Sequence, residues 1–350
     1  MLSSAGCHFG FVFLCAFAGV FQGKAGYTYA RQGTPTTDAL ERKITRMEGG
    51  VSSLSFATGM AALSALFTTL LRAGDHLISS QYIFGNTNSL FGTLQLLGVE
   101  ITLVDPTDVK AVAAALRPNT RMVFTETIAN PGTQVADLEG IGEFCKANQL
   151  VYVVDNTLTS PWLFQPRVVG ASIVMNSLSK HIGGHAHALG GSLTDTGLFD
   201  WSTYPNILDV YKKGAPAGWG MTQIKKKGLR DMGATLSADA AHRIAVGAET
   251  LSLRLDKICS NAMALATAAQ APRRNTSSAA ALPLRKASVN TAASGSTRNK
   301  KIKPSASPNR VYLTQAGSVV PALALRTARV LVAALMTVLP SGGAARPAMR

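Results

Sequence analysis

Cysteine is scarce in this chain of 350 residues, and none of its four copies forms a CxxC pair. A disulfide-stapled secreted domain or a cysteine-rich zinc site would need closely spaced cysteines. The pattern therefore argues against both classes of protein. It favours a reducing compartment, and we expect the protein to be cytoplasmic.

Acidic residues are missing altogether from the end of the chain. Residues 267–350 contain 13 lysines and arginines, no aspartate or glutamate, and a single aromatic residue, Tyr312. A segment of this composition lacks the means to build a packed core. We expect a basic, low-complexity tail over 267–350, which is either naturally disordered or the product of a shifted reading frame.

The formal net charge of +15 comes almost entirely from that tail. Residues 1–266 carry 21 basic and 19 acidic residues, so their net charge is only +2. A nearly neutral body predicts no nucleic-acid partner. Salt-sensitive nucleic-acid binding through the tail is the alternative.

The N-terminal apolar run at 9–21 has no lysine or arginine before it. A secretory signal carries such a charge, and a membrane-spanning helix needs about 20 apolar residues. We therefore expect neither a signal peptide nor a membrane partner. Residues 1–25 are interpreted as an N-terminal arm, whose apolar run is either an amphipathic starting helix or an artefact of the choice of start site.

Residues 36–195 alternate between continuous apolar runs and amphipathic segments. This alternation predicts an α/β fold with a mostly parallel sheet and helices on both faces. The helix over 36–50 can be capped by Thr36 or Thr37 and ends at two glycines. The expected strands are 51–56, 76–81, 99–105, 121–127, 150–156, 171–177 and 189–195.

The remaining body of the chain falls into two parts. Residues 196–235 have the composition of a loop-rich segment, and an apolar stripe then predicts one long helix from about 237 to 266. We expect 26–235 to form a large ligand-binding domain. The long helix, over 236–266, would lead onward to a smaller domain.

Two segments at strand ends are candidates for binding a ligand, because ligands of open α/β sheets bind beyond the carboxyl ends of the strands. One could bind an anion and the other could pair with a ring nitrogen. In FATGMAAL (56–63) a strand turns into a helix, so free N–H groups near Gly59 and Met60 suit a phosphate. In VVDNT (153–157) Asp155 can pair with a protonated ring nitrogen. An ordinary junction and a turn aspartate are the alternatives.

A third segment, NSLSKHIGGHAHALGG (176–191), contains Lys180. A desolvated lysine loses its proton more readily and becomes an imine-forming nucleophile. Ser177 and Ser179 can donate hydrogen bonds to a phosphate, and a solvated lysine in a glycine-rich loop is the alternative. We expect no metal at its three histidines, because no carboxylate or cysteine lies near and their spacing does not suit one helix face.

Two further segments complete the set. In TETIANP (125–131) Glu126 and Asn130 lie just beyond a strand, and Asn130 could reach a ring hydroxyl. In GYTYARQGTPT (26–36) Tyr29 and Arg31 stand two apart in an extended stretch and would point the same way. An arginine beside a tyrosine hydroxyl is a good phosphate clamp. Both segments could instead be surface loops.

The order of these segments from Gly26 to Ala266 resembles the Cys/Met-metabolism family of pyridoxal-phosphate (PLP) enzymes, of the cystathionine γ-synthase type. The resemblance covers about two-thirds of the chain. The stretches YTYARQGTPTT, ITRMEGG, QYIFGNTNSLF, KKKGLRDMGATLS and HRIAVGAETLSLR are most similar to its O-acetylhomoserine sulfhydrylase group. The resemblance implies an aspartate-aminotransferase-like large domain (fold type I), followed by a smaller C-terminal domain.

The resemblance also implies roles for individual residues. Lys180 would hold PLP as a Schiff base and move protons during catalysis, while Asp155 would hold the pyridinium nitrogen. Phe84 falls where the wider family has a tyrosine stacked on the ring, so stacking survives without the phenol. The expected phosphate ligands are the backbone of Gly59 and Met60, the side chains of Ser177 and Ser179, and Tyr29 and Arg31 from a neighbouring subunit of a homotetramer, a dimer of dimers.

The implied reaction is a γ-replacement on small-molecule substrates. O-acetyl-L-homoserine and sulfide would give homocysteine and acetate, or methanethiol would give methionine. A cystathionine γ-synthase, a γ-lyase acting on cystathionine or methionine, and a truncated, non-catalytic PLP-binding protein are the alternatives. Nothing in 267–350 matches the small domain, whose arginine grips the substrate carboxylate, and Arg326 and Arg329 lack its motif.

Overall fold

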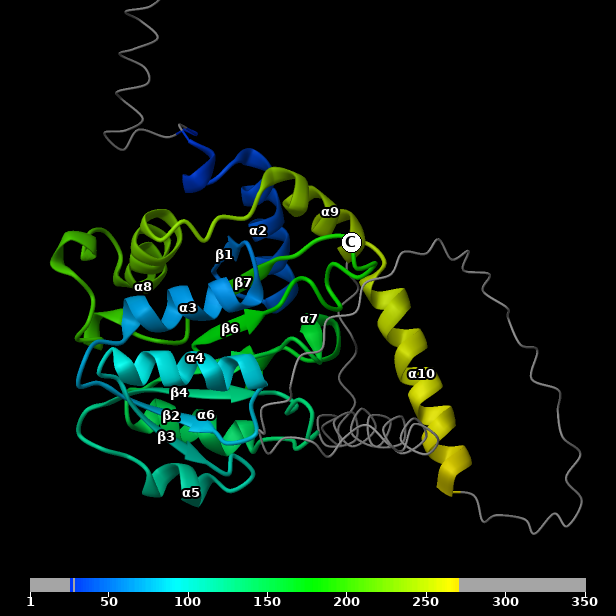
Figure 1. Ribbon diagram of the computed structural model, residues 1–350, viewed down its shortest axis with the longest axis horizontal. Helices are drawn as coiled ribbons and strands as arrows, with labels where there is room; N and C mark the ends of the chain where they lie inside the picture. Colours follow the sequence, from blue (N-terminus) through cyan, green and yellow to red (C-terminus); the bar gives the residue numbers. More distant parts are fainter. Residues whose placement is uncertain (1–25, 28, 271–350) are drawn as a thin grey trace, which may run out of the picture.

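A seven-stranded sheet with helices packed against it dominates the protein (Figure 1). The computed structural model describes residues 26, 27 and 29–270. The predicted N-terminal arm and most of the predicted basic tail, residues 271–350, lie outside the described residues. The α/β fold expected from the sequence is confirmed.

The strands are ordered β1-β7-β6-β5-β4-β2-β3. Strands β2 to β6 run parallel to one another, whereas β7 is antiparallel to both β1 and β6. The sheet is therefore mostly parallel, as predicted. Its strands are β1 Ser52–Phe56, β2 His76–Ser80, β3 Glu100–Val104, β4 Thr120–Glu126, β5 Val151–Asp155, β6 Ile173–Asn176 and β7 Gly191–Asp195.

Helices cover both faces of the sheet, which explains why its central strands β4, β5 and β6 are buried along almost their whole length. On one face lie α3 (Gly59–Leu70), α4 (Gly85–Leu96) and α8 (Trp219–Gln223), over a core that contains edge-to-face phenylalanine rings. The other face packs against α5 (Val109–Ala114) and α6 (Leu138–Ala147).

A third apolar cluster joins α2 (Pro35–Glu48) to the C-terminal helices. The N-cap of α2 is Thr34, so the prediction of Thr36 or Thr37 was wrong. Thr34 Oγ1 accepts from Thr37 N at 3.1 Å, and Thr37 Oγ1 accepts from Thr34 N at 2.8 Å. Thr37 is thus the partner at the third helical position in a capping box, with a proline at the first helical position.

The prediction of one long helix over 237–266 was wrong. The structure has two, α9 (Ala238–Ala248) and α10 (Leu251–Gln270), and Figure 1 shows α10 projecting from the body of the protein. The carbonyl of Gly247 accepts from Thr250 Oγ1 at 3.2 Å and from Arg254 Nη2 at 2.9 Å. These side-chain hydrogen bonds compete with the backbone hydrogen bonds that would continue the helix, and the helix is interrupted there.

The segment predicted to be loop-rich, 196–235, contains helical turns. Its longest is the π-helix η6 (Ile224–Asp231), which continues α8. A Cβ on Gly220 would lie 2.4 Å from the Trp201 ring, and one on Gly228 would lie 2.6 Å from Ala65 Cβ, so close packing requires both glycines. Those glycines weaken the local helical pattern.

The remaining elements are short helices. They are η1 Ala30–Gln32, α7 Ser160–Leu163, η2 Pro166–Val169, η3 Trp201–Thr203, η4 Asp209–Tyr211 and η5 Pro216–Gly218. Within the described ranges, no helix has both the length and the apolar character that a bilayer crossing requires.

Candidate active site

A pocket of about 490 Å³ lies beyond the carboxyl ends of β4, β5 and β6, and the arrowheads of β4 and β6 in Figure 1 point toward this edge of the sheet. This is where an open α/β sheet binds its ligands. Eight of the ten residues predicted for the site line it, although their roles toward a cofactor stay predictions. These eight are Gly59, Met60, Phe84, Asn130, Asp155, Ser177, Ser179 and Lys180.

The N-terminus of α3 forms one wall of the pocket. Thr58 caps it, accepting from Ala61 N at 3.0 Å, which leaves the first N–H groups of the helix free for an anion. A Cβ on Gly59 would lie 3.0 Å from Met175 Cε and from Ser177 Cβ. Glycine therefore lets this helix end approach β6 closely.

Asp155 and Glu126 place two carboxyl groups side by side, because they face each other in the parallel pairing of β4 and β5. Burial raises the pKa of Asp155, whose Oδ1 accepts from Thr157 N at 2.9 Å. No hydrogen bond reaches its Oδ2 within the part of the chain that the structure describes. Burial, and then the charge of Asp155, raises the pKa of Glu126 to about 8.

Glu126 organises the wall that holds Phe84 and Asn130. Its Oε1 accepts from Phe84 N at 2.6 Å, and its Oε2 accepts from Asn130 N at 3.2 Å. The sequence pattern located Glu126 beyond its strand and assigned it no role, whereas it is the last residue of β4. The sequence signal that could have revealed the role of Glu126 is that two neighbouring strands each end in an acidic residue.

The pH dependence of stability tests this arrangement. An unfolded Glu126 titrates near 4.5, so between pH 4.5 and about 8 the folded state binds more protons than the unfolded state. The folded state should therefore lose stability as pH rises through that window. The loss is at most about 1.4 kcal/mol for each unit by which folding raises the pKa of Glu126. We expect Glu126→Gln to flatten the fall in unfolding free energy of the cofactor-free protein, measured by urea denaturation from pH 5 to 9.

The matched control for this measurement is Glu139→Gln, on the exposed side of α6. It should reproduce the pH profile of the unsubstituted protein. If the unfolding free energy of Glu126→Gln and of the control changed with pH in the same way, Glu126 would not be protonated in the folded state.

Lys180 follows β6 in a tight turn, with its N–H donating to Ser177 O at 3.1 Å. The side chain is exposed, contrary to the expected desolvation, because this turn lies at the protein surface. No hydrogen bond or ion pair engages Lys180 Nζ in the described ranges. The amine is therefore free to react with a carbonyl in the pocket.

The two serines beside Lys180 are differently engaged. Ser177 N donates to Thr157 Oγ1 at 2.8 Å, and its own hydroxyl lines the pocket. Ser179 Oγ donates to Gly190 O at 3.2 Å and accepts from Gly190 N at 2.9 Å. Ser179 thus closes the base of the 177–190 loop, and its predicted phosphate contact stays a prediction.

Tyr29 and Arg31 are not brought to this pocket. Arg31 lies 5.3 Å from the centre of the Tyr29 ring and donates to Arg230 O, and Thr235 Oγ1 donates to Arg31 O at 2.8 Å. Tyr29 is 59% exposed. Their position outside the chain's own pocket is compatible with the predicted contact to a neighbouring subunit.

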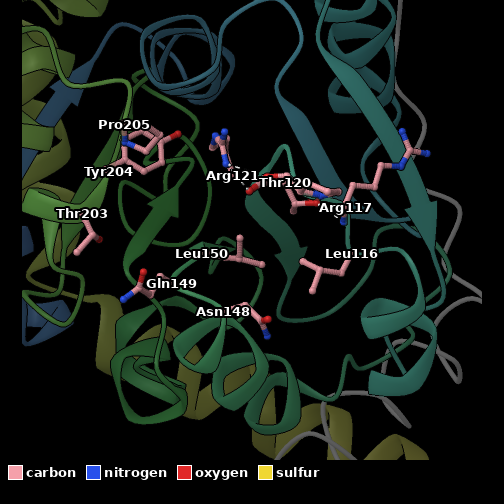
Figure 2. Close-up of a pocket in the computed structure, with 11 residues that line it drawn as sticks. Leu116, Arg117, Thr120, Arg121, Asn148, Gln149, Leu150, Thr203, Tyr204 and Pro205 are labelled. Carbon is pink, nitrogen blue, oxygen red and sulfur yellow. Dashed lines mark hydrogen bonds between the residues drawn. The ribbon is translucent and has the colours of Figure 1, made fainter.

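A second hollow, of about 680 Å³, lies at the opposite ends of the strands, around the start of β4 (Figure 2). Its two arginines already have acidic partners. Arg117 Nη1 lies 2.6 Å from Glu100 Oε2, and Arg121 Nε lies 3.2 Å from Asp75 Oδ1. This hollow lacks the free amine and the buried carboxyl pair of the first pocket, so the first pocket is the candidate active site.

The histidine-rich loop that follows Lys180 contains two histidines whose rings lie against each other. His185 and His187 stack with ring centres 5.3 Å apart, and His187 Nε2 lies 3.0 Å from Arg243 O. Among residues 26, 27 and 29–270, no three histidine, cysteine or acidic side chains are close enough to hold a metal ion.

Comparison with known families decides the class of protein. Residues 9–274 match the family described as Cys/Met metabolism PLP-dependent enzymes. The chain belongs to this family. The cofactor of its members is the pyridoxal phosphate that their description names.

Individual relatives within the Cys/Met-metabolism PLP-dependent family carry different activities in their names. An O-acetyl-L-homoserine sulfhydrylase of Corynebacterium glutamicum is 37% identical, over 69% of this chain and 59% of its own. An L-methionine gamma-lyase of Fusobacterium nucleatum is 34% identical, over 68% and 56%. This chain therefore spans less than two-thirds of the length of either relative.

A solved structure from Campylobacter jejuni has the same fold. It contains N'-pyridoxyl-lysine-5'-monophosphate and aligns with a TM-score of 0.69 at 29% identity, covering 74% of this chain and 68% of that one. The aspartate-aminotransferase-like fold type expected for the family is therefore confirmed.

Three features of the pocket fit PLP. Gly59 leaves room at a helix end where a phosphate can approach backbone N–H groups. Within the described residues one oxygen of Asp155 has no hydrogen bond, and a positively charged ring nitrogen would offset the cost of its burial. Lys180 lines the same pocket, and its amine is unbonded in that part of the chain. The volume also lies within the range of small-molecule sites.

Proposed function

We propose that this chain is the cofactor-binding part of an O-acetylhomoserine sulfhydrylase. In the proposed reaction sulfide replaces the acetate of O-acetyl-L-homoserine at Cγ, giving homocysteine and acetic acid, and methanethiol would give methionine. The observation that carries the proposal is the meeting of Lys180, Asp155 and the N-terminus of α3 in one pocket. Identity of 37% to a sulfhydrylase supports the choice of reaction.

PLP supplies an electron sink for charge that develops next to the amino-acid Cα. The chain's own residues bind and orient it. The α3 N-terminus, near Gly59 and Met60, would hold the phosphate, and Asp155 would hold the ring nitrogen. Lys180 would attach the cofactor through its amine and, once displaced by the substrate, would take the Cα proton onto Nζ.

Phe84 favours replacement over elimination within this family. It lines the pocket at the start of α4 and is 41% exposed, so its ring can stack on a flat cofactor. It carries no phenol hydroxyl and so cannot act as an acid or base. A γ-lyase that relies on a tyrosine in this place would lose that group, and a sulfhydrylase would not.

A second copy of the chain is part of the proposal. Tyr29 and Arg31 lie outside their own chain's pocket, and Arg31 presents a cation suited to a phosphate. We propose that they complete the phosphate site of a neighbouring copy within a dimer of dimers. The N-terminal segment would then contribute to a pocket that is incomplete in one chain.

Product analysis tests the proposed reaction. The purified full chain, loaded with PLP, should form homocysteine from O-acetyl-L-homoserine and sulfide at least tenfold faster than it releases methanethiol from methionine. Methanethiol release as the faster reaction would select the γ-lyase seen in the Fusobacterium relative's name. PLP binding without either product would select a non-catalytic PLP-binding protein.

A further inference from the structure

Glu48, the last residue of α2, is a fully buried acid that the sequence pattern did not single out. Its Oε1 accepts from Asn156 Nδ2 at 3.1 Å and from Asn176 Nδ2 at 2.6 Å. Asn156 directly follows Asp155, and Asn176 directly precedes Ser177. One carboxyl group therefore connects the exits of β5 and β6, from which two residues of the cofactor pocket emerge.

Asn156 is itself held firmly, so the connection is rigid. Its Nδ2 also donates to Phe164 O at 2.9 Å, and its Oδ1 accepts from the hydroxyl of Thr159. Through this amide the carboxyl of Glu48 is linked to the loop that follows β5. A displacement of Glu48 would therefore be passed to Asp155 through one intervening side chain.

Two oxygens in this cluster are buried and have no hydrogen-bond partner among the residues that the structure describes. They are Glu48 Oε2 and Asn176 Oδ1. Asn176 Oδ1 can only accept a hydrogen bond, and Glu48 Oε2 can only accept one as long as Glu48 is ionised, so the two acceptors cannot pair with each other and leaving them unpaired is costly. A protonated Glu48 would supply the one kind of group that the cluster lacks, an O–H donor. It would also remove an uncompensated buried charge.

The charges around Glu48 do not offset an ionised carboxylate. Among the elements that pack against α2, strand β1 and helix α7 contain no charged residue. Strand β7 contributes Asp195, whose oxygens bond Gly197 N and Trp201 Nε1. Strand β5 ends at the acid Asp155.

The remaining charges lie on helices α9 and α2. Helix α9 contributes Asp239, His242 and Arg243, all exposed. On α2 itself, Lys43 pairs with Glu249, Arg42 and Arg46 are exposed, and the partly buried Asp38 and Glu41 accept from Tyr27 and Ser55. None of these groups forms an ion pair with Glu48 in the described part of the chain. Burial, opposed only by the two amide hydrogen bonds, raises the pKa of Glu48 to about 7.

We propose that the buried Glu48 holds a proton in the folded protein at mildly acidic pH and acts as a positioning residue, whose neutral carboxyl joins Asn156 to Asn176 and so fixes the spacing between Asp155 and Ser177. This inference rests on the proposed cofactor site. It assigns a function to a residue outside the pocket, since Glu48 touches neither cofactor nor substrate.

Two substitutions separate positioning from simple packing. Glu48→Gln keeps the shape of the neutral acid and always carries a donor, so PLP affinity should stay within about twofold of the unsubstituted chain at pH 6.5. Glu48→Leu removes every polar contact and should weaken PLP binding by about tenfold or more, since misplaced site residues are costly. Affinity is measured by titrating the cofactor's absorbance band on the full chain.

The pH profile gives a readout that a packing role would not move. Above pH 7 Glu48 ionises in the unsubstituted chain, so its PLP affinity and melting temperature should fall relative to those of Glu48→Gln. The exposed Glu143→Gln on α6 is the matched control and should follow the unsubstituted chain. Should Glu48→Leu fail to fold, the comparison with Glu48→Gln still decides the matter.

Three outcomes are distinguishable. Diverging profiles for the unsubstituted chain and Glu48→Gln between pH 6 and 9 support the proposal. Coincident profiles, or loss of affinity in Glu48→Gln equal to that in Glu48→Leu, overturn it. A chain that binds no PLP at any pH would sink the proposed function, and the melting profiles would then decide the protonation of Glu48 by themselves.

Discussion

Lys180→Ala should leave a protein that borohydride no longer labels with the cofactor. The alanine removes the only atom through which the chain is proposed to bind PLP covalently, and with it the group that moves the substrate's protons. Loss of a nucleophile that also acts as acid and base should lower homocysteine formation by at least about 1000-fold. Mass spectrometry of the reduced protein and a rate assay measure the two effects.

The fold should survive this substitution, because Lys180 is exposed and its side chain makes no hydrogen bond within the described residues. Lys146→Ala, at an exposed position of α6, is the matched control and should keep both the label and the rate. A reduced adduct that persists at another lysine in Lys180→Ala would sink the assignment.

Asp155→Asn should produce the second largest loss. The asparagine keeps the size of the side chain but cannot balance a positive charge on the ring nitrogen, so the cofactor's capacity as an electron sink should fall. We expect turnover to drop by about 100-fold or more and PLP affinity to weaken. Steady-state rates and an absorbance titration with PLP provide the measurements.

The substitution should also change the neighbouring acid. The charge of Asp155 contributes to the raised pKa of Glu126, so a neutral asparagine should lower that pKa and make Glu126 easier to ionise. Asp209→Asn, at an exposed position on η4, is the control and should leave rate and affinity unchanged. Full turnover by Asp155→Asn would show that another group holds the ring.

The strand ends show how far local patterns reach. Apolar runs predicted all seven strands, and the candidate site segments were expected at strand ends or helix starts, at the carboxyl edge of the sheet. This expectation holds for Asp155, Ser177 and Lys180 because parallel strands deliver their exits to the same edge. The helix end at Gly59 was predictable for a different reason, because the residues that make a turn act locally in the sequence.

Other parts of the site depend on contacts between distant segments. Glu126 becomes part of the pocket only because β4 pairs with β5 in the register that places it against Asp155. Glu48 is 108 residues from Asn156 in the chain, and their hydrogen bond forms only when α2 docks on the sheet. The exposure of Lys180 likewise reflects where its turn lies in the folded chain.

By itself, the sequence determined the α/β class, the positions of the strands, and the residue types that meet at the pocket, because periodicity, caps and glycine turns act over a few residues. The tertiary structure alone decided the antiparallel direction of β7, the break between α9 and α10, the pairing of Glu126 with Asp155, and the burial of Glu48. These features arise from packing and hydrogen bonding between segments far apart in the chain. Burial in turn sets the protonation of the acids that surround the cofactor site.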